Sequence, residues 1–137
     1  MHRLAVLALV LVMLVGCDTS QAIYNISGKP ILVSAGEDPT DAQLRSTIIR
    51  TLAGKRWVIK ETGSGLIETT TSRGERSATI LVTYSTKAYS IRYKDSANFE
   101  FNANKERKHY NGSLINRRYN GWIRKLEKLF DQNLAGL

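Results

Sequence analysis

The feature that most constrains the fold is a set of four consecutive segments, within residues 56–94, in which apolar and polar side chains alternate. Such alternation is typical of β-strands with one buried face, and turn residues separate neighbouring segments. The sequence therefore predicts a four-stranded antiparallel meander. We expect its buried face to consist of Trp57, Ile59, Ile67, Ala78, Ile80, Val82, Tyr84, Tyr89, Ile91 and Tyr93.

The first connection of the meander is predicted to be a three-residue loop, Gly63–Gly65. A two-residue loop would place Ile59 and Ile67 on opposite faces, because side chains alternate along a strand. With the three-residue loop, Glu61 and Glu68 point to opposite faces of the sheet. We therefore do not expect them to form the facing carboxylate pair of a glycosidase.

The second and third connections are predicted to be two-residue turns, at Gly74–Glu75 and Thr86–Lys87. Glycine in the first position, as in the former, suits a type II′ turn. These turns place Ile80 opposite Thr69 on one side and opposite Tyr93 on the other. The register of the three later strands follows from them.

A helix is predicted before the meander, over residues 39–53. Asp38 can cap its N-terminus, Pro39 suits the first helical position, and Gly54 offers a left-handed stop. Apolar residues recur there at the spacing of one helix face. The stripe consists of Leu44, Ile48, Ile49, Leu52 and Ala53.

A second helix is predicted over residues 113–133, after a polar loop over 95–112 that holds one short strand near 98–101. The short apolar runs 23–26 and 30–33 could each supply an edge strand. The apolar face of the second helix consists of Leu114, Ile115, Tyr119, Trp122, Ile123, Leu126, Leu129 and Phe130. The predicted fold class is α+β, with a four-stranded antiparallel meander preceded by one helix and packed by a C-terminal helix.

The N-terminal segment indicates export. An uninterrupted apolar run from Leu4 to Val15 follows a short, weakly positive start. Its length suits a secretory signal peptide, whereas a membrane-spanning helix needs about 20 apolar residues. The run ends in Leu14-Val15-Gly16-Cys17, which closely resembles the lipobox of bacterial lipoproteins. This resemblance implies cleavage after Gly16 and lipidation of Cys17 by a diacylglyceryl group and further acyl chains such as palmitate.

The lipobox divides the chain into a signal peptide over residues 1–16, a lipidated tether over 17–22 and a single α+β domain over 23–137. Several acyl chains anchor a protein stably, so we expect a membrane-bound lipoprotein with its domain in the periplasm. Asp18 resembles the inner-membrane retention signal of enteric bacteria, although the choice between inner and outer membrane stays open. The alternative for Cys17 is a buried free thiol after an ordinary signal peptide.

Three motifs between about Leu52 and Leu129 carry a wider resemblance. They are Lys55-Arg56-Trp57, Ile91-Arg92-Tyr93-Lys94-Asp95-Ser96 and Arg118-Tyr119-Asn120-Gly121-Trp122-Ile123. This arrangement resembles a group of small Gram-negative lipoproteins and exported proteins of uncharacterised function. In that group a tryptophan opens the meander and Tyr-Asn-x-Trp lies in the last helix. The resemblance implies the fold and an envelope location, and it supplies no catalytic residues.

Positive charge gathers in the C-terminal part of the chain. The full sequence has 20 Lys and Arg residues against 12 Asp and Glu, a formal net charge of +8 at pH 7. The candidate anion-binding residues are Arg117, Arg118, Arg124, Lys125 and Lys128. They avoid the apolar stripe, so we expect them to face solvent together and to attract anionic lipid headgroups, phosphorylated glycolipid or acidic polymer. The alternative is a solvated helix face that only keeps the protein soluble.

The sequence assembles no catalytic or metal-binding constellation. His109 is the one histidine outside the signal peptide, whereas a serine or cysteine triad needs an oriented base and zinc sites need several ligands. We expect His109 to be solvated within the basic segment 105–109, and the aromatic residues to be core rather than a ligand groove. The sequence therefore predicts no enzyme activity, no metal and no cofactor.

Two hypotheses about function remain. The first is a non-enzymatic accessory or scaffold protein that docks an envelope protein partner, which requires an open strand edge or an exposed apolar patch. The second is a binding module for an anionic envelope ligand, which requires a concave basic site. Nucleic acid is not an expected partner, because the aromatic residues of the last helix lie on its apolar stripe and the arginines mostly elsewhere.

Overall fold

The computed structural model describes residues 19–34, 36–107 and 110–137. The predicted signal peptide, Cys17, Asp18 and His109 lie outside the described residues. In chain order the elements are β1 (Ser20–Ala22), β2 (Ile26–Pro30), α1 (Asp41–Gly54), β3 (Val58–Gly63), β4 (Leu66–Arg73), β5 (Arg76–Tyr84), β6 (Ala88–Ala97), β7 (Asn102–Arg107), β8 (Tyr110–Asn116) and α2 (Arg117–Ala135).

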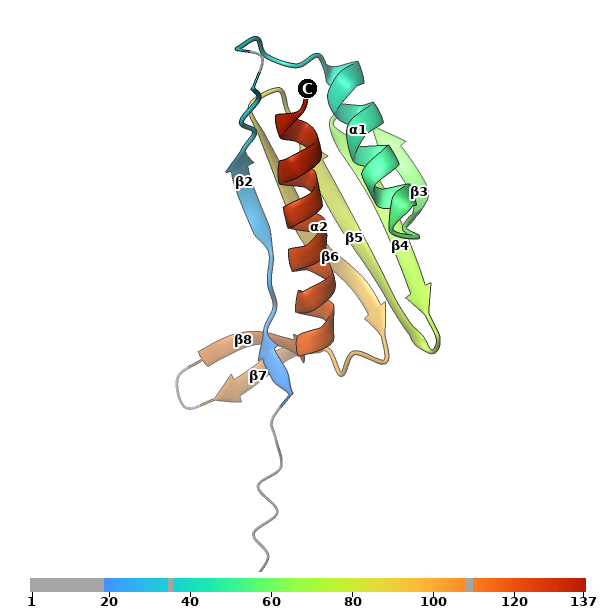
Figure 1. Ribbon diagram of the computed structural model, residues 1–137. Coiled ribbons are helices and arrows are strands. Elements are labelled where there is room, and N and C mark those ends of the chain that lie inside the picture. Colours follow the sequence, from blue (N-terminus) through green and yellow to red (C-terminus); the bar gives the residue numbers. More distant parts are fainter. Residues whose placement is uncertain (1–18, 35, 108–109) are drawn as a thin grey trace, which may run out of the picture.

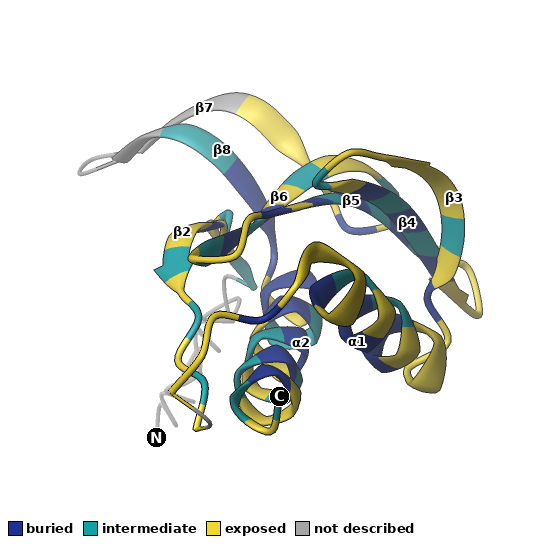
Figure 2. Ribbon diagram, turned by 90° about the horizontal axis from the view of Figure 1, so that it is seen from above, coloured by how far each residue is buried: buried dark blue, intermediate teal, exposed yellow. Residues whose placement is uncertain are grey.

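A five-stranded antiparallel sheet, in the order β2-β6-β5-β4-β3, forms the main layer of the domain (Figure 1). Helices α1 and α2 lie side by side on one face, and the sheet curves over them when seen from above (Figure 2). The predicted α+β class is confirmed. The sheet has one strand more than the predicted meander, because β2 pairs with β6 as an edge strand. Pro30 ends β2, and an edge tolerates its missing N–H.

The two later connections of the meander match the prediction. Ile80 lies opposite Thr69 and Tyr93, as the turns at Gly74–Glu75 and Thr86–Lys87 require. Gly74 has a positive φ of 61°, the conformation that favours glycine. Of the predicted buried face, Ile59 and Tyr93 are half-buried and the other residues are buried.

The first hairpin differs from the prediction. A two-residue turn, Ser64–Gly65, joins β3 to β4, and a β-bulge between Ile59 and Glu61 shifts the register. The extra residue of the bulge returns apolar side chains to the same face, which is the effect expected of the longer loop. Glu61 and Glu68 are therefore cross-strand partners, and the prediction that they point to opposite faces is wrong. Glu68 forms an ion pair with Lys94 of β6.

Helix α1 begins after Thr40 rather than at Pro39. The Thr40 hydroxyl accepts a hydrogen bond from Gln43 N (3.1 Å), and the Gln43 side chain accepts one from Thr40 N (2.9 Å). This reciprocal capping box fixes the helix start. Asp38, the predicted cap, instead forms an ion pair with Lys87.

Helix α1 ends in a Schellman motif. Trp57 N donates to Leu52 O (3.0 Å), and Arg56 N donates to Ala53 O (3.1 Å). The left-handed residue is Arg56, with a φ of 63°, whereas Gly54 is the last helical residue. The prediction of a left-handed stop at Gly54 is therefore wrong. The motif turns the chain so that Trp57 is buried in the core.

Residues 102–116 contain a β-hairpin where a polar loop was predicted. Strands β7 and β8 pair with each other, and β1 pairs with the other side of β8. The resulting three-stranded sheet, in the order β1-β8-β7, projects at one end of the main sheet (Figure 1). Residues 20–22, which we expected in the tether, are thus part of the folded domain.

Helix α2 begins at Arg117, later than predicted. The Asn116 side chain accepts a hydrogen bond from Arg118 N (3.0 Å) and caps the helix. Leu114 and Ile115, predicted on the helix, are instead buried in strand β8.

The core lies between the main sheet and the two helices. Its largest fully buried side chains are Tyr89, Tyr119, Phe99 and Phe130. Trp122, predicted on the apolar face of the last helix, is only partly buried and packs at the margin of this core. No helix in the described part of the chain is long and apolar enough to cross a membrane.

Candidate anion-binding site

Helix α2 carries the predicted basic residues on the side turned away from the sheet, which faces the reader in Figure 1. We call the set the basic face, and all of its members are exposed: Arg117, Arg118, Arg124, Lys125 and Lys128. At about 100° per residue they fall within an arc of about 120°. The opposite side of α2 buries Tyr119, Ile123, Leu126, Phe130 and Leu134. The structure therefore brings the five candidate cations together on one surface.

The acidic residues of α2 lie next to the Arg124 side of the basic face and contact β2, β6 and the segment before β2. Glu127 accepts hydrogen bonds from Tyr24 Oη (2.7 Å) and Lys29 Nζ (3.1 Å). Asp131 accepts one from Tyr89 Oη (2.8 Å) and also pairs with Lys29. The hydrogen bond to Glu127 raises the pKa of Tyr24, and burial raises that of Tyr89. Both carboxylates are thus engaged by β2 and β6 and form no ion pair with the basic face.

A hollow of about 100 Å³ lies beside the basic face, between α2 and the ends of α1 and β4. We call it the Trp122 hollow, and it is lined by Lys55, Trp57, Arg73, Trp122, Lys125 and Leu126. Its three cations come from three different elements. Lys55 follows α1, Arg73 ends β4, and Lys125 belongs to the basic face. Basic and aromatic side chains thus converge on one concave site.

Two arginines pack on the aromatic side chains at this site. The Arg73 guanidinium carbon lies 4.9 Å from the Trp122 ring centroid, and that of Arg76 lies 6.0 Å from the Phe99 centroid. Phe99 and Trp122 are perpendicular, with centroids 4.8 Å apart. Arg73 Nη2 also donates to Lys55 O (3.3 Å). These contacts hold Arg73 in place by cation–π attraction and one hydrogen bond.

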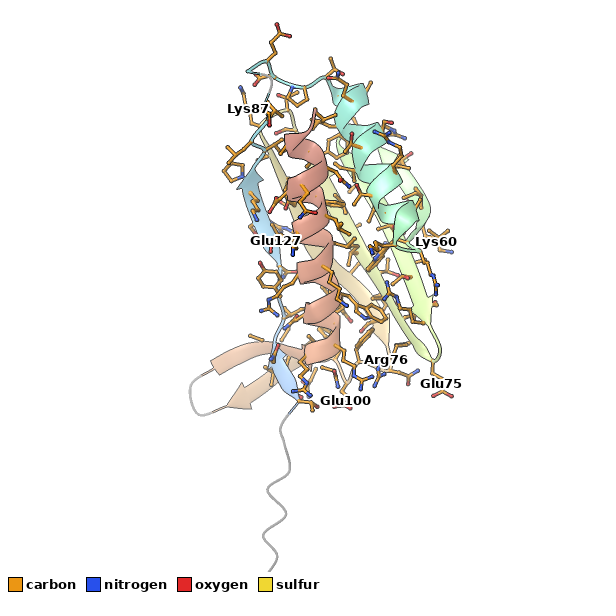
Figure 3. The ribbon with its side chains drawn as sticks, in the orientation of Figure 1. Lys60, Glu75, Arg76, Lys87, Glu100 and Glu127 are labelled. Carbon is orange, nitrogen blue, oxygen red and sulfur yellow. The ribbon has the colours of Figure 1, made fainter. Side chains whose placement is uncertain are left out.

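The charge around the hollow is not neutralised by contact. The ion pairs within residues 19–34, 36–107 and 110–137 involve Lys29, Lys87 and Lys94. None of them includes Lys55, Arg73, Arg76 or a residue of the basic face. The nearest acid in sequence, Glu75, is exposed in the turn beside Arg76 (Figure 3). An anion would therefore meet cations that no carboxylate already pairs.

The N-terminal segment is fastened to the start of α2. Arg117 N donates to Thr19 O (2.8 Å). The side chain of Asn120, 1% exposed, donates to Ala22 O (2.9 Å) and accepts from Tyr24 N (2.9 Å). We call these contacts the N-terminal clamp. They give Asn120 a structural role in the Tyr-Asn-x-Trp motif, while Tyr119 is core and Trp122 stacks with Arg73.

The clamp places the basic face near the predicted lipidation site. Thr19 follows Cys17 by two residues. Since an extended chain spans at most about 3.6 Å per residue, the Cα atoms of Cys17 and Thr19 are at most about 7 Å apart. Thr19, two residues after the predicted lipidation site, therefore lies at the same end of the domain as Arg117, the first residue of the basic face.

Sequence reasoning found the basic face and missed the Trp122 hollow. The five cations of α2 recur at helical spacing, so their common surface could be predicted from periodicity. Lys55, Arg73 and Arg76 lie far from α2 in sequence, and only the fold brings them to Trp122. The one sequence feature that pointed to a further cluster of cations was the Gly74–Glu75 turn, which has an arginine on each side.

Other features offer less chemistry. A larger hollow of about 440 Å³, between the C-terminal part of α2 and α1, holds a single cation, Arg50. No group of three or more histidine, cysteine, aspartate or glutamate side chains suited to a metal ion occurs among the residues the structure describes. No family model, curated protein or solved structure matches the chain.

Proposed function

We propose that this chain is a lipid-anchored protein of the bacterial envelope, without enzyme activity, that binds a phosphate-bearing anionic ligand through the basic face of α2. The observation that carries this proposal is the joint position of five exposed cations on one side of α2, none of which forms an ion pair within the described part of the chain. The clamp between Thr19 and Arg117 supports it, because it keeps this surface beside the predicted anchor at Cys17.

Two arginines in the first turn of α2 favour a binding role over mere solubility. Arg117 and Arg118 lie at the positive end of the helix dipole, and the first turn holds no acidic residue. Cations there are disfavoured by about 0.3–1 kcal/mol each, whereas an anion at that end is attracted. A chain that needed only net charge would lose less stability by carrying these arginines elsewhere.

The proposed location rests on the lipobox at Leu14–Cys17 and on the resemblance to small Gram-negative lipoproteins. In this proposal Cys17 carries the acyl chains, the domain lies in the periplasm, and Asp18 favours the inner membrane. Cys17→Ser should abolish palmitate labelling and release the protein from membranes or leave an uncleaved precursor. Unchanged labelling and fractionation of this variant would refute the anchor.

The anionic ligand is tested with vesicles and the unlipidated chain from Asp18 onward. A basic residue near an anionic surface contributes about 1 kcal/mol, and salt shortens the screening length from about 10 Å at 0.1 M to about 3 Å at 1 M. The protein should sediment with phosphatidylglycerol vesicles at low salt and dissociate from them at high salt. It should not sediment with neutral vesicles.

A matched pair of variants separates the basic face from net charge. Replacement of Arg117, Arg124 and Lys128 by glutamine should abolish sedimentation. Replacement of three exposed cations on other surfaces, Arg50, Lys60 and Arg92, lowers the net charge equally and should preserve most of it. Equal behaviour of the two variants would show that the basic face has no special role.

Docking of a protein partner is the second candidate, and the surface favours it less. Exposed large apolar side chains occur on separate segments, at Leu32, Val58, Leu66 and Phe101. Strand β3 is an open edge of the sheet, but it carries a bulge and two charged side chains, Lys60 and Glu61, which discourage strand addition. Crosslinking that captured a specific partner at β3 would favour this candidate instead.

A further inference from the structure

We propose that the Trp122 hollow is a specific site for a doubly charged phosphoryl group. This inference rests on the proposed anionic-ligand function and deepens it, because it names a built site beside the diffuse basic face. The hollow is concave, small and lined by three cations, Lys55, Arg73 and Lys125. Its apolar floor comes from Trp57, Trp122 and Leu126.

Arg73 is the residue prepared to bind the ligand. Stacking on Trp122 and the bond from Nη2 to Lys55 O fix the plane of its guanidinium. Stacking uses the face of the group and leaves the N–H donors in its plane free. No other hydrogen bond of the Arg73 side chain occurs within the described part of the chain. A fixed guanidinium with free donors suits bidentate recognition of a phosphate.

Arg76 is a second arginine next to Arg73. Its Nε atom is buried and has no hydrogen-bond partner among the described residues. Leaving a buried donor unpaired costs about 1–3 kcal/mol, and more when the group is charged. Arg76 and Arg73 line a second hollow of about 320 Å³, together with Gly74, Glu75 and Asn98. With less than 1 Å² of exposed surface this Nε atom is out of reach of a ligand, so Arg76 contributes its positive charge beside Arg73.

The number of cations selects the ligand class. Lys55, Arg73 and Lys125 line the Trp122 hollow, and Arg76 lines the second hollow with Arg73 and Glu75. None of these four cations forms an ion pair among the residues described. A single carboxylate would balance one of them, whereas a phosphomonoester carries close to two negative charges at neutral pH and offers three acceptor oxygens. The rest of such a ligand would remain outside, because the hollow holds about 100 Å³.

Tryptophan fluorescence reports directly on this site, because both tryptophans of the chain, Trp57 and Trp122, line the hollow. The full chain, processed in cells and purified in neutral detergent, is titrated with inorganic phosphate against sodium chloride at equal ionic strength. A saturable change in emission is expected with phosphate alone. A response to chloride and phosphate that is the same at equal ionic strength would overturn the proposal.

Three variants separate a built site from general charge. Arg73→Gln should weaken phosphate binding at least tenfold. Arg73→Lys should weaken it nearly as much, because an ammonium keeps the charge without the planar fork. Arg92→Gln, on the outer face of the sheet, changes net charge equally and should bind within twofold of the parent. Retained binding in both Arg73 variants, with their circular dichroism spectra unchanged, would overturn the proposal.

Two further arms identify the source of the phosphoryl group and separate this proposal from the broader one. Vesicles with phosphatidic acid, a phosphomonoester lipid, should change the emission more than phosphatidylglycerol vesicles of equal surface charge if the ligand is a headgroup. A response to inorganic phosphate alone identifies a soluble phosphoryl ligand. The variant lacking Arg117, Arg124 and Lys128 should keep its phosphate response, so failure of the basic face and failure of the hollow are distinguishable.

Discussion

Replacing Asn120 with alanine tests the N-terminal clamp. Asn120 is 1% exposed and makes three hydrogen bonds to the N-terminal segment, with Ala22 O (2.9 Å), Tyr24 N (2.9 Å) and Gln21 Oε1 (3.2 Å). The alanine variant leaves two partly buried backbone groups, Ala22 O and Tyr24 N, without their partner. We expect the segment from residue 19 to residue 24 to loosen.

The size of the effect follows from these bonds. An unpaired buried backbone group costs about 1–3 kcal/mol. Alanine is the better helix former by about 0.6 kcal/mol, which offsets part of the loss. Both groups are only partly buried, so the lower end of this range applies, and the free energy of unfolding should fall by about 1.5 kcal/mol, with a decrease in Tm of about 6 °C for a domain of this size.

Urea denaturation followed by circular dichroism measures this loss, and hydrogen exchange localises it. Amide protons of β1 and of Tyr24 should exchange faster in Asn120→Ala, whereas those of β4 and β5 should change less. Asn133→Ala is the matched control, since Asn133 is an exposed asparagine of the same helix with one bond, to Thr51 Oγ1 (2.8 Å). Equal, small losses in both variants would refute the clamp.

Three further predictions concern the frame of the domain. Gly65→Ala should lower the free energy of unfolding, measured by urea denaturation, by about 1–3 kcal/mol, because φ is 65° and the new Cβ would lie 2.7 Å from a carbonyl oxygen of β5. At Gly74 a new Cβ meets no atom within 4 Å, so Gly74→Ala should cost less. Thr40→Ala removes the capping box of α1 and should lower the free energy of unfolding by about 1 kcal/mol, and an unchanged urea midpoint would contradict it. Burial raises the pKa of Tyr89 and Tyr119 above the usual 10.0, so these phenols ionise at lower pH in the unfolded chain than in the folded one. The free energy of unfolding should therefore be constant below pH 10 and fall as the pH rises beyond it, and a urea midpoint constant to about pH 11 would argue against buried phenols.

The sequence predicted the later strands well because their turns are short and their alternation is interrupted only at Leu81. The first hairpin was different, since a three-residue loop and a two-residue turn with a bulge both leave Ile59 and Ile67 on one face. Alternation alone does not distinguish these two solutions. Their difference becomes visible only in the cross-strand pairing of Glu61 with Glu68.

The second sheet escaped prediction for two physical reasons. Strand β7 is polar, so it lacks the apolar alternation that marks a half-buried strand. Leu114 and Ile115 precede Tyr119 at nearly helical spacing, which extended the predicted helix across Asn116. The capping side chain of Asn116 ends the strand and starts the helix, and a single asparagine is a weak signal in a polar segment.

The candidate site divides in the same way. Periodicity along one helix was enough to predict the basic face. The Trp122 hollow depends on contacts between α1, β4 and α2, and its key cation, Arg73, lies about 50 residues from Trp122 in the chain. Residues that meet through the fold alone leave no local pattern for a sequence to display.

The N-terminal clamp has a consequence for where such a protein can act. Many anchored proteins stand on a flexible stalk that lets them sample the space between two membranes. Here, with Cys17 lipidated as we propose, only Asp18 separates the anchor from the folded domain. Helix α2, with 19 residues, is about 28 Å long at about 1.5 Å per residue. The basic face therefore meets its ligands by diffusion in the plane of the membrane. A partner in solution has to approach to within a few nanometres of the bilayer to reach this face.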